Sequence, residues 1–244
     1  MKEKRPRWVI PKEWIGETAV IIGGGPTLRK EDIAYAKGKG WRRIVCNDSY
    51  LLDPEAEVLV WGDRRWYEWN RHNLTLHQGS YKIAWQDVEK TEGYRFHILR
   101  HADQRPELRQ WLQDVSRFDE GTKELKRAIQ QALQYPDNLL TEDPGKIAGT
   151  NTGQGAINVA YHFGVKRIVL LGFDMRATKV DGKWRLQWHD FHRRGTEISR
   201  YKEIFAPSIR IQAEILRSKG IEIVNCTSKS ELRGIPIVSL ESLL

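Results

Sequence analysis

The sequence predicts a single α/β domain in which a mostly parallel sheet carries helices on both faces. Short β-branched runs alternate with stretches of helical period over most of the 244 residues. Several of these runs are continuously apolar, as in parallel strands that are covered on both faces. The length suits one large domain better than two independent ones. We therefore expect residues 1–244 to form one domain.

The expected strands are short and bounded by Gly, Asp or Asn. In order, they are Ala19–Ile22, Ile44–Cys46, Val58–Trp61, Lys82–Trp85, Phe96–Leu99, Ile168–Leu171, Ile221–Asn225 and Ile237–Leu240. The expected helices lie between many of them. They are Lys30–Lys37, Asp63–Arg71, Pro106–Gln113, Glu120–Gln134, Gly153–Phe163 and Ile204–Lys219.

Two segments interrupt the alternation of strands and helices. Residues 100–148 are charged, Gln-rich and helical in pattern, which indicates a helical insertion or cap over an edge of the sheet. Residues 174–200 contain few aliphatic side chains and many cationic ones. A loop of this length in a compact domain is usually functional or disordered. We interpret 174–200 as a mobile basic lid and call it the lid segment.

The composition indicates an anionic partner. The formal net charge is +8, which suits nucleotide phosphate, nucleic acid or an acidic glycan. Several of the ten tryptophans stand beside Arg or Lys, where they could stack on bases or sugars, or else cover the edge of the core.

No apolar run approaches the roughly 20 residues of a membrane span, and the basic stretch Met1–Arg7 has no apolar region behind it. Cys46 and Cys226 each end a strand-like run, as buried free thiols do. We expect a cytoplasmic protein without a membrane span. The sequence does not decide whether it forms a homo-oligomer.

The first expected strand leads into a turn of small residues. It consists of Gly23, Gly24, Gly25, Pro26 and Thr27. Glycines there let backbone N–H groups approach a phosphate, and the following helix adds a positive dipole. The turn lacks the third glycine of the dinucleotide fingerprint and the lysine of a P-loop. It indicates a phosphate-binding turn, with a plain tight turn as the alternative.

Polar residues follow the next two expected strands. Asn47 and Asp48 come after the second strand, and Asp63 and Arg64 after the third. Ligands of open α/β sheets bind at the carboxyl ends of the strands. Asn47 or Asp48 could contact a ribose or base edge, Asp63 a metal ion or sugar hydroxyl, and Arg64 a phosphate. Each could instead be a helix N-cap.

A second turn of small residues spans 149–155 and precedes the expected helix that Gly164 ends. Asn151 and Thr152 are good N-caps, and Gly153 leaves the first helical turn without a side chain. This is a second candidate phosphate site; the alternative is a capped helix that packs closely on the sheet.

The lid segment opens with Asp174, at the end of a buried strand, and contains His189 and His192. The acid could be a base, a metal ligand or a cap. The two histidines could act as a general base, bind phosphate or form a small metal site, for which two histidines are weak evidence. The alternative is that they are surface residues without a function.

These motifs together resemble a known superfamily. The glycine turn followed by Pro-Thr-Leu28, then Cys46-Asn47, and the later Gly172-Phe173-Asp174 are similar to the small bacterial sialyltransferases that use CMP-sialic acid. The chain also resembles the MptE-like 6-hydroxymethylpterin diphosphokinases. Its Trp-His-x-x-His stretch in the lid segment and its late Asn225-Cys-Thr-Ser-Lys-Ser230 resemble phage and prophage proteins of this superfamily.

The resemblance implies a Rossmann-like fold and a nucleotide site. Carried over by position, the lining residues would be Gly24, Gly25, Asn47, Asp63, Asn151 and Thr152. The family's lid histidine falls near Tyr201 here, and the asparagine of its Gly-Asn-Gly turn is replaced by Gly24.

Three functions remain open. The first is a glycosyltransferase with a CMP- or UDP-type nucleotide-sugar donor, in which His189 or His192 acts as base. The second is a diphosphokinase that uses ATP and Mg²⁺, with Asp63 and Asp174 as metal ligands. The third is a non-enzymatic nucleotide or nucleic-acid binding protein. A phage-encoded chain would act in a bacterial host cell, with DNA or a surface glycan as acceptor.

Overall fold

The computed structural model describes residues 8–85, 97–102, 107–134, 139–191 and 197–243. Its centre is a seven-stranded sheet in the order β11-β8-β1-β2-β3-β4-β5, in which every neighbouring pair is parallel. The prediction of an α/β fold with a parallel sheet is confirmed. The strands are β1 (Thr18–Ile22), β2 (Arg42–Cys46), β3 (Val58–Trp61), β4 (Tyr81–Ala84), β5 (His97–Ile98), β8 (Arg167–Leu171) and β11 (Glu222–Asn225).

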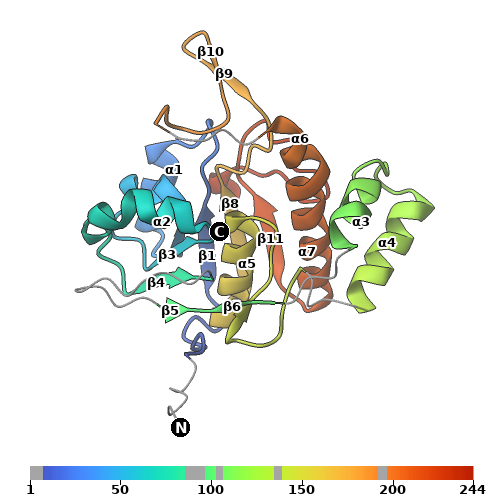
Figure 1. The fold of residues 1–244 in the computed structure, drawn as a ribbon, viewed down its shortest axis with the longest axis horizontal. Coiled ribbons are helices and arrows are strands. Elements are labelled where there is room, and N and C mark those ends of the chain that lie inside the picture. The colour runs from blue at the N-terminus through green and yellow to red at the C-terminus, as the bar shows by residue number, and fades with distance from the viewer. Residues whose placement is uncertain (1–7, 86–96, 103–106, 135–138, 192–196, 244) are drawn as a thin grey trace.

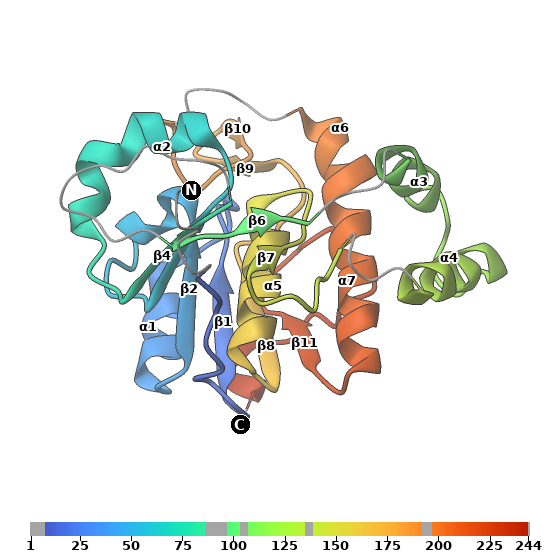
Figure 2. The same cartoon turned by 60° about the horizontal axis from the view of Figure 1, so that its bottom comes forward.

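Helices cover both faces of this sheet (Figure 1). Alternate residues of each strand point to opposite faces, so that Ala19 and Ile21 join one buried cluster while Val20 and Ile22 join the other. Figure 2 shows α5 and α7 in front of the strands. The helices of the first cluster are α5 (Thr152–Phe163) and α7 (Ala206–Ser218), and those of the second are α1 (Lys30–Gly38) and α2 (Arg64–Asn70).

The order of the strands reverses between β1 and β8. The chain runs outward from β1 through β2, β3 and β4 to β5, and then returns to place β8 on the other side of β1. Ile22 pairs with Leu171, so the carboxyl ends of β1 and β8 lie side by side. Such a reversal leaves a crevice at the carboxyl edge, which is where open α/β sheets bind ligands.

The described part of the inserted segment contains two strands and two helices. β6 (Arg100–His101) and β7 (Lys146–Ile147) form a short parallel pair. Helices α3 (Leu108–Val115) and α4 (Lys123–Gln134) contact α7 and lie on its outer side, at the right of Figure 1. They carry an apolar stripe of buried residues such as Leu112 and Leu125.

The described part of the lid segment contains a hairpin that the sequence does not predict. β9 (Thr178–Val180) and β10 (Lys183–Arg185) form an antiparallel hairpin that projects beyond the carboxyl edge of the sheet, at the top of Figure 1. The helix α6 (Ile198–Arg200) is followed by a π-helical turn, η4 (Tyr201–Phe205), that continues into α7.

One expected strand is absent. Ile237–Leu240 forms no strand: Ile237 makes a single bridge with Asn225, and Leu240–Ser242 is the 3₁₀ helix η5. Pro236 stands before this stretch and cannot donate to a strand ladder. Short 3₁₀ helices also follow β2, as η1 (Asn47–Leu51), and α2, as η2 (Arg71–Leu76). None of the described helices is both long and apolar enough to span a bilayer.

Candidate functional site

The glycine turn packs directly against the end of β8. Gly23 N–H donates to Leu171 O and Gly25 N–H to Gly172 O, each at 2.8 Å. A β-carbon on Gly23 would stand 2.8 Å from Gly172 O, so a larger residue could not approach β8 in this way. Two of the N–H groups expected to bind phosphate therefore bond within the protein, and the glycines serve close packing as well.

Asp174 faces the same turn. Its Oδ1 accepts a hydrogen bond of 3.2 Å from Thr27 N–H, and its carboxylate covers Gly25. The other oxygen, Oδ2, is buried and has no hydrogen-bond partner in the described part of the chain. Burial raises the pKa of Asp174 to about 6, although the bonds from Thr27 oppose that rise. A carboxyl group with a pKa near neutrality, in a crevice, is suited to proton transfer.

Asn47 and Thr152 meet across the crevice. The Asn47 amide and the Thr152 hydroxyl lie within hydrogen-bonding distance, 3.3 Å from Nδ2 to Oγ1, although 105 positions separate them. Asn47 adopts φ 50°, a left-handed conformation that Asn tolerates better than most residues. Asn151 caps α5 by accepting from Gln154 N–H at 3.0 Å. The structure thus brings the ends of β1 and β2 and the start of α5 to one edge.

Asp48 and His189 form a buried pair beside the glycine turn. His189 Nε2 lies 3.4 Å from Asp48 Oδ2, and Trp66 Nε1–H donates to the other oxygen, Oδ1, at 3.0 Å. The neighbouring Ser49 hydroxyl donates to Gly23 O at 2.6 Å. The histidine ring also stacks on Phe191. The pair joins the lid segment to the end of β2, so His189 is neither solvent-exposed nor remote from the crevice.

The lid segment closes over Gly24. Trp188 N–H donates to Gly24 O at 2.9 Å, and the side-chain amide of Gln187 occupies the space where a β-carbon of Gly24 would stand. Gln187 Nε2 donates to the Tyr201 hydroxyl at 3.2 Å. Tyr201 opens the π-helical turn η4, a type of turn that is frequent at functional sites. The amide of Gln187 therefore fills the space above the middle glycine.

Other predicted site residues do not join this cluster. Asp63 is the N-cap of α2, accepts from Arg65 N–H at 2.9 Å and pairs with the Arg65 guanidinium. Arg64 pairs with Glu68 on the exposed face of the same helix. Gly153, in contrast, lies near the glycine turn, because it packs against the ring of Phe173, on which Gly23 also packs. His192 lies outside the described residues. Within the described ranges, no three His, Cys, Asp or Glu side chains are grouped closely enough to hold a metal ion.

The late motif Asn225–Ser230 secures the end of β8. Thr227 Oγ1 accepts from Phe173 N–H at 2.9 Å, and the Ser230 hydroxyl donates to Phe173 O at 2.6 Å. Sequence reasoning noticed this motif but missed its role. The three hydroxyl residues among positions 227–230, after the last strand, were the signal, since Ser and Thr bond readily to nearby backbone groups.

Trp85 was also missed. Its indole lies against Gly62, which follows β3, and against Gly155 of α5, where a β-carbon would stand 2.7 Å from the ring. It directly follows β4, so the rule that ligands bind at carboxyl ends of strands would have placed it in the crevice.

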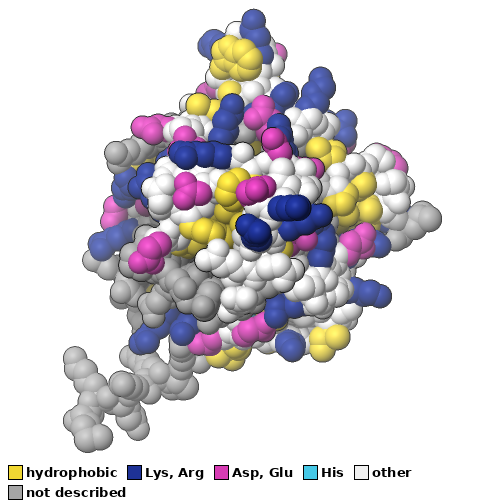
Figure 3. All heavy atoms as spheres, turned by 90° about the vertical axis from the view of Figure 1, so that its right-hand side faces the viewer, with side chains coloured by type: hydrophobic (Ala, Val, Ile, Leu, Met, Phe, Trp, Pro, Cys, Tyr) yellow, Lys and Arg dark blue, Asp and Glu magenta, His cyan; other side chains and the backbone are white. Residues whose placement is uncertain are grey.

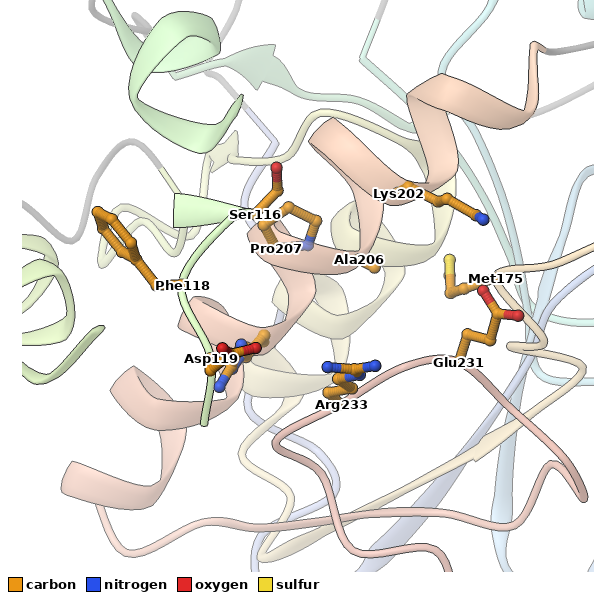
Figure 4. Close-up of a pocket in the computed structure, with 10 residues that line it drawn as sticks. Ser116, Phe118, Asp119, Met175, Lys202, Ala206, Pro207, Glu231 and Arg233 are labelled. Carbon is orange, nitrogen blue, oxygen red and sulfur yellow. The ribbon is translucent and has the colours of Figure 1, made fainter. Parts of the chain in front are cut away.

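Two neighbouring pockets are lined in part by residues that follow Asp174. The lid pocket has a volume of about 650 Å³ and lies between the hairpin, the 228–231 segment and η4, with Thr27 in its wall. The helix pocket, of about 480 Å³, is lined by the segment 116–119 that follows α3, by the start of α7 and by residues of the 231–233 segment. Figure 4 shows Lys202 and Glu231 on one side of the helix pocket and Asp119 on the other. The pockets share Lys202 and Glu231.

Comparisons with known proteins give structural neighbours only, one of them a distant sialyltransferase. No family model matches the sequence, and no curated protein matches it either. Among solved structures, the chain is similar to a mutant of the alpha-2,3/8-sialyltransferase CstII. The identity is 13% and the TM-score 0.44, over 91% of this chain and 86% of that chain.

Proposed function

We propose that this chain is a nucleotide-dependent transferase, and specifically a glycosyltransferase that uses a CMP- or UDP-type sugar donor. One observation carries the proposal: segments from β1, β2, β8 and α5 meet at the reversal of strand order, together with a buried acid and an Asp–His pair. A simple binding module needs no acid with a pKa near neutrality at such a place.

The donor would lie along Gly24, Asn47 and Thr152 once Gln187 has moved aside. Asp174 would accept the proton of the acceptor hydroxyl, because its carboxyl group is largely ionised at neutral pH. The acceptor oxygen then bonds to the anomeric carbon while the bond from that carbon to the phosphate oxygen breaks. His189, held by Asp48, would place a positive charge or a proton at the leaving phosphate.

The diphosphokinase alternative has less support. It needs Asp63 and Asp174 as Mg²⁺ ligands, and Asp63 is already engaged by the start of α2 and by Arg65. DNA and surface glycans both remain acceptors compatible with the net charge of +8. A non-enzymatic binding protein would use the same basic surface without turnover.

A thermal-shift screen tests the proposal. CMP, UDP, GDP and ADP compounds are added with and without Mg²⁺ or Mn²⁺, at about 100 times the dissociation constant where binding occurs. We expect a CMP or UDP compound to raise the melting temperature by about 5–10 °C without metal. Stabilisation by ATP with metal alone would favour the diphosphokinase, and no response to any nucleotide would refute both enzymes.

Matched variants locate the binding site. Asn47→Gly keeps the left-handed backbone and removes the amide, and Thr152→Val removes only the hydroxyl. Both should reduce the thermal shift. Thr75→Val is the control, because Thr75 is exposed in η2, before β4 and away from the carboxyl edge. An equal loss in all three would contradict the assigned site.

A further inference from the structure

We propose that the lid pocket binds a phosphate monoester group of the acceptor. The inference rests on the proposed transferase function, because it assigns to that reaction the chemical class of its second substrate. It is carried by the charge of the pocket, by buried polar atoms that lack partners, and by the position of the pocket beside Asp174.

The lid pocket is lined by an excess of cationic side chains. Four of its side chains are cationic and one is acidic, so the lining carries a net charge of +3: Arg176, Lys179, Lys202, Lys229 and Glu231. None of the four forms an ion pair within 4 Å in the described ranges, although Arg176 lies near enough to Asp174 to oppose the rise in its pKa. Many basic side chains elsewhere have acidic partners, such as Arg42 with Glu17. Four like charges at one cavity repel one another unless an anion neutralises them.

Two buried polar atoms of the same pocket lack partners. Arg176 Nε and Thr178 Oγ1 are both inaccessible to solvent and make no hydrogen bond to another described residue. Buried polar atoms are nearly always hydrogen-bonded, so these two are available to bond to an anion. Lys229, which lines the pocket, holds φ 59°, a strained conformation for a lysine. Strain of this kind is concentrated at ligand sites.

The lid pocket adjoins the candidate base. Thr27 belongs both to the glycine turn and to the wall of the pocket, and its N–H donates to Asp174. Glu231, on the opposite wall, donates its backbone N–H to Asp174 O at 2.9 Å. An acceptor whose anionic group lies in the pocket would thus have its remaining atoms within reach of Asp174. This is the arrangement that a transfer between two substrates requires.

Charge and shape favour a phosphate monoester. A doubly charged monoester balances a net charge of +3 better than a singly charged carboxylate does, and lysines bind phosphate as point charges. The volume of about 650 Å³ accommodates a small phosphorylated molecule. Trp184, on the rim, is 73% exposed, so its indole can stack on a sugar or base. At the top of Figure 3, the projecting hairpin presents a hydrophobic side chain between Lys and Arg side chains.

Calorimetric titration of the full chain tests the inference with three probes. They are inorganic phosphate, glucose 6-phosphate and a 5′-phosphorylated single-stranded oligonucleotide. Lys202→Ala and Lys229→Ala should each weaken binding of every probe about tenfold or more, because each removes a charge-assisted hydrogen bond. Lys166→Ala is the control, since this exposed lysine precedes β8 at the opposite edge of the sheet. It should change the dissociation constants less than about twofold.

The same titrations identify the source of the phosphate and separate the two proposals. If the sugar phosphate or the oligonucleotide binds more tightly than inorganic phosphate, and Trp184→Ala removes that difference, the probe that binds more tightly carries the ring that stacks on Trp184. Each probe is titrated again with the nucleotide that stabilises the protein at saturation, and unchanged probe binding supports two separate sites. Displacement of the probes by nucleotide, no probe binding, or equal losses in Lys166→Ala would each overturn the inference. Failure of all nucleotides to bind refutes the transferase, whatever the probes do.

Discussion

The carboxylate of Asp174 lies over Gly25 and occupies the space that a β-carbon of this residue would need. Gly25→Ala should therefore push the acid away from Thr27 N–H, a bond that fixes its position. We expect a loss of stability of about 1–3 kcal/mol from overpacking, with loss of turnover. Urea unfolding and a turnover assay measure the two effects.

Gly38→Ala is the matched control for this change. Gly38 ends α1, and a β-carbon added to it would meet no atom within 4 Å. The substitution should leave turnover intact and stabilise the protein slightly, by less than about 1 kcal/mol. Equal changes in stability and turnover in both alanine variants would show that the packing of Asp174 on Gly25 affects neither quantity.

Asp174→Asn should stabilise the protein and abolish turnover. The pKa is 3.8 for the free side chain and about 6 in the fold, so the unfolded chain loses its proton first. The wild-type protein therefore loses stability as the pH rises from about 4 to about 6. The variant removes this loss, by about 3 kcal/mol at pH 7.5 and about half of that at pH 5. Denaturant unfolding at both pH values measures the difference.

Asp114→Asn is the control for that variant. Asp114 is half-exposed on α3, and its nearest cation, Arg117, lies 3.8 Å away. Its replacement should change stability by less than about 0.5 kcal/mol at either pH. A pH-independent gain in Asp174→Asn would contradict the cost of a buried charge at this position.

Breaking the Asp48–His189 pair should reduce turnover without releasing nucleotide. His189→Ala and Asp48→Asn each remove a partner of the 3.4 Å contact, and we expect turnover to fall about a hundredfold or more. His192→Ala tests the second histidine of the predicted pair. His72→Ala, at an exposed position in η2, is the control. Unchanged turnover in His189→Ala would remove this residue from the mechanism.

Removing the amide of Gln187 should tighten nucleotide binding. The amide fills the space above Gly24 and is held by the Tyr201 hydroxyl, so a bound nucleotide must displace it. Gln187→Ala and Tyr201→Phe should each lower the dissociation constant about fivefold, the equivalent of one hydrogen bond. Gln110→Ala, on the exposed side of α3, should have no effect. Weaker binding in both variants would instead make Gln187 a contact of the nucleotide.

The periodicity of the sequence was sufficient to predict the sheet. Seven of the eight expected strands form. Runs such as Val58–Trp61 are buried on both faces of the sheet, and their continuously apolar sequence is typical of such strands. Ile237–Leu240 has the same composition but sits after Pro236 and makes one bridge only. Pairing depends on a free neighbouring strand edge, which composition does not encode.

The candidate site could be predicted only in part. The rule for strand ends placed Asn47 and Asp174 correctly at the carboxyl edge, because that rule follows from topology alone. The same rule selected Asp63, which caps α2. An Asp that follows a strand can either bind a ligand or cap the next helix, and the sequence does not distinguish the two roles. Gln187 gave no signal, and Tyr201 was noted only because the family's lid histidine falls near it. Their contact depends on how the lid segment folds back over the glycine turn.

The two hydrogen bonds that Thr227 and Ser230 make with Phe173 have a thermodynamic consequence. They tie the segment that forms one wall of the lid pocket to the residue immediately before Asp174. A ligand that shifts this wall therefore shifts the carboxylate, and the proton affinity of Asp174 must in turn change the affinity of the pocket for anions. Linkage makes these two effects equal in free energy, so the pH dependence of anion binding reports the ionisation of the acid.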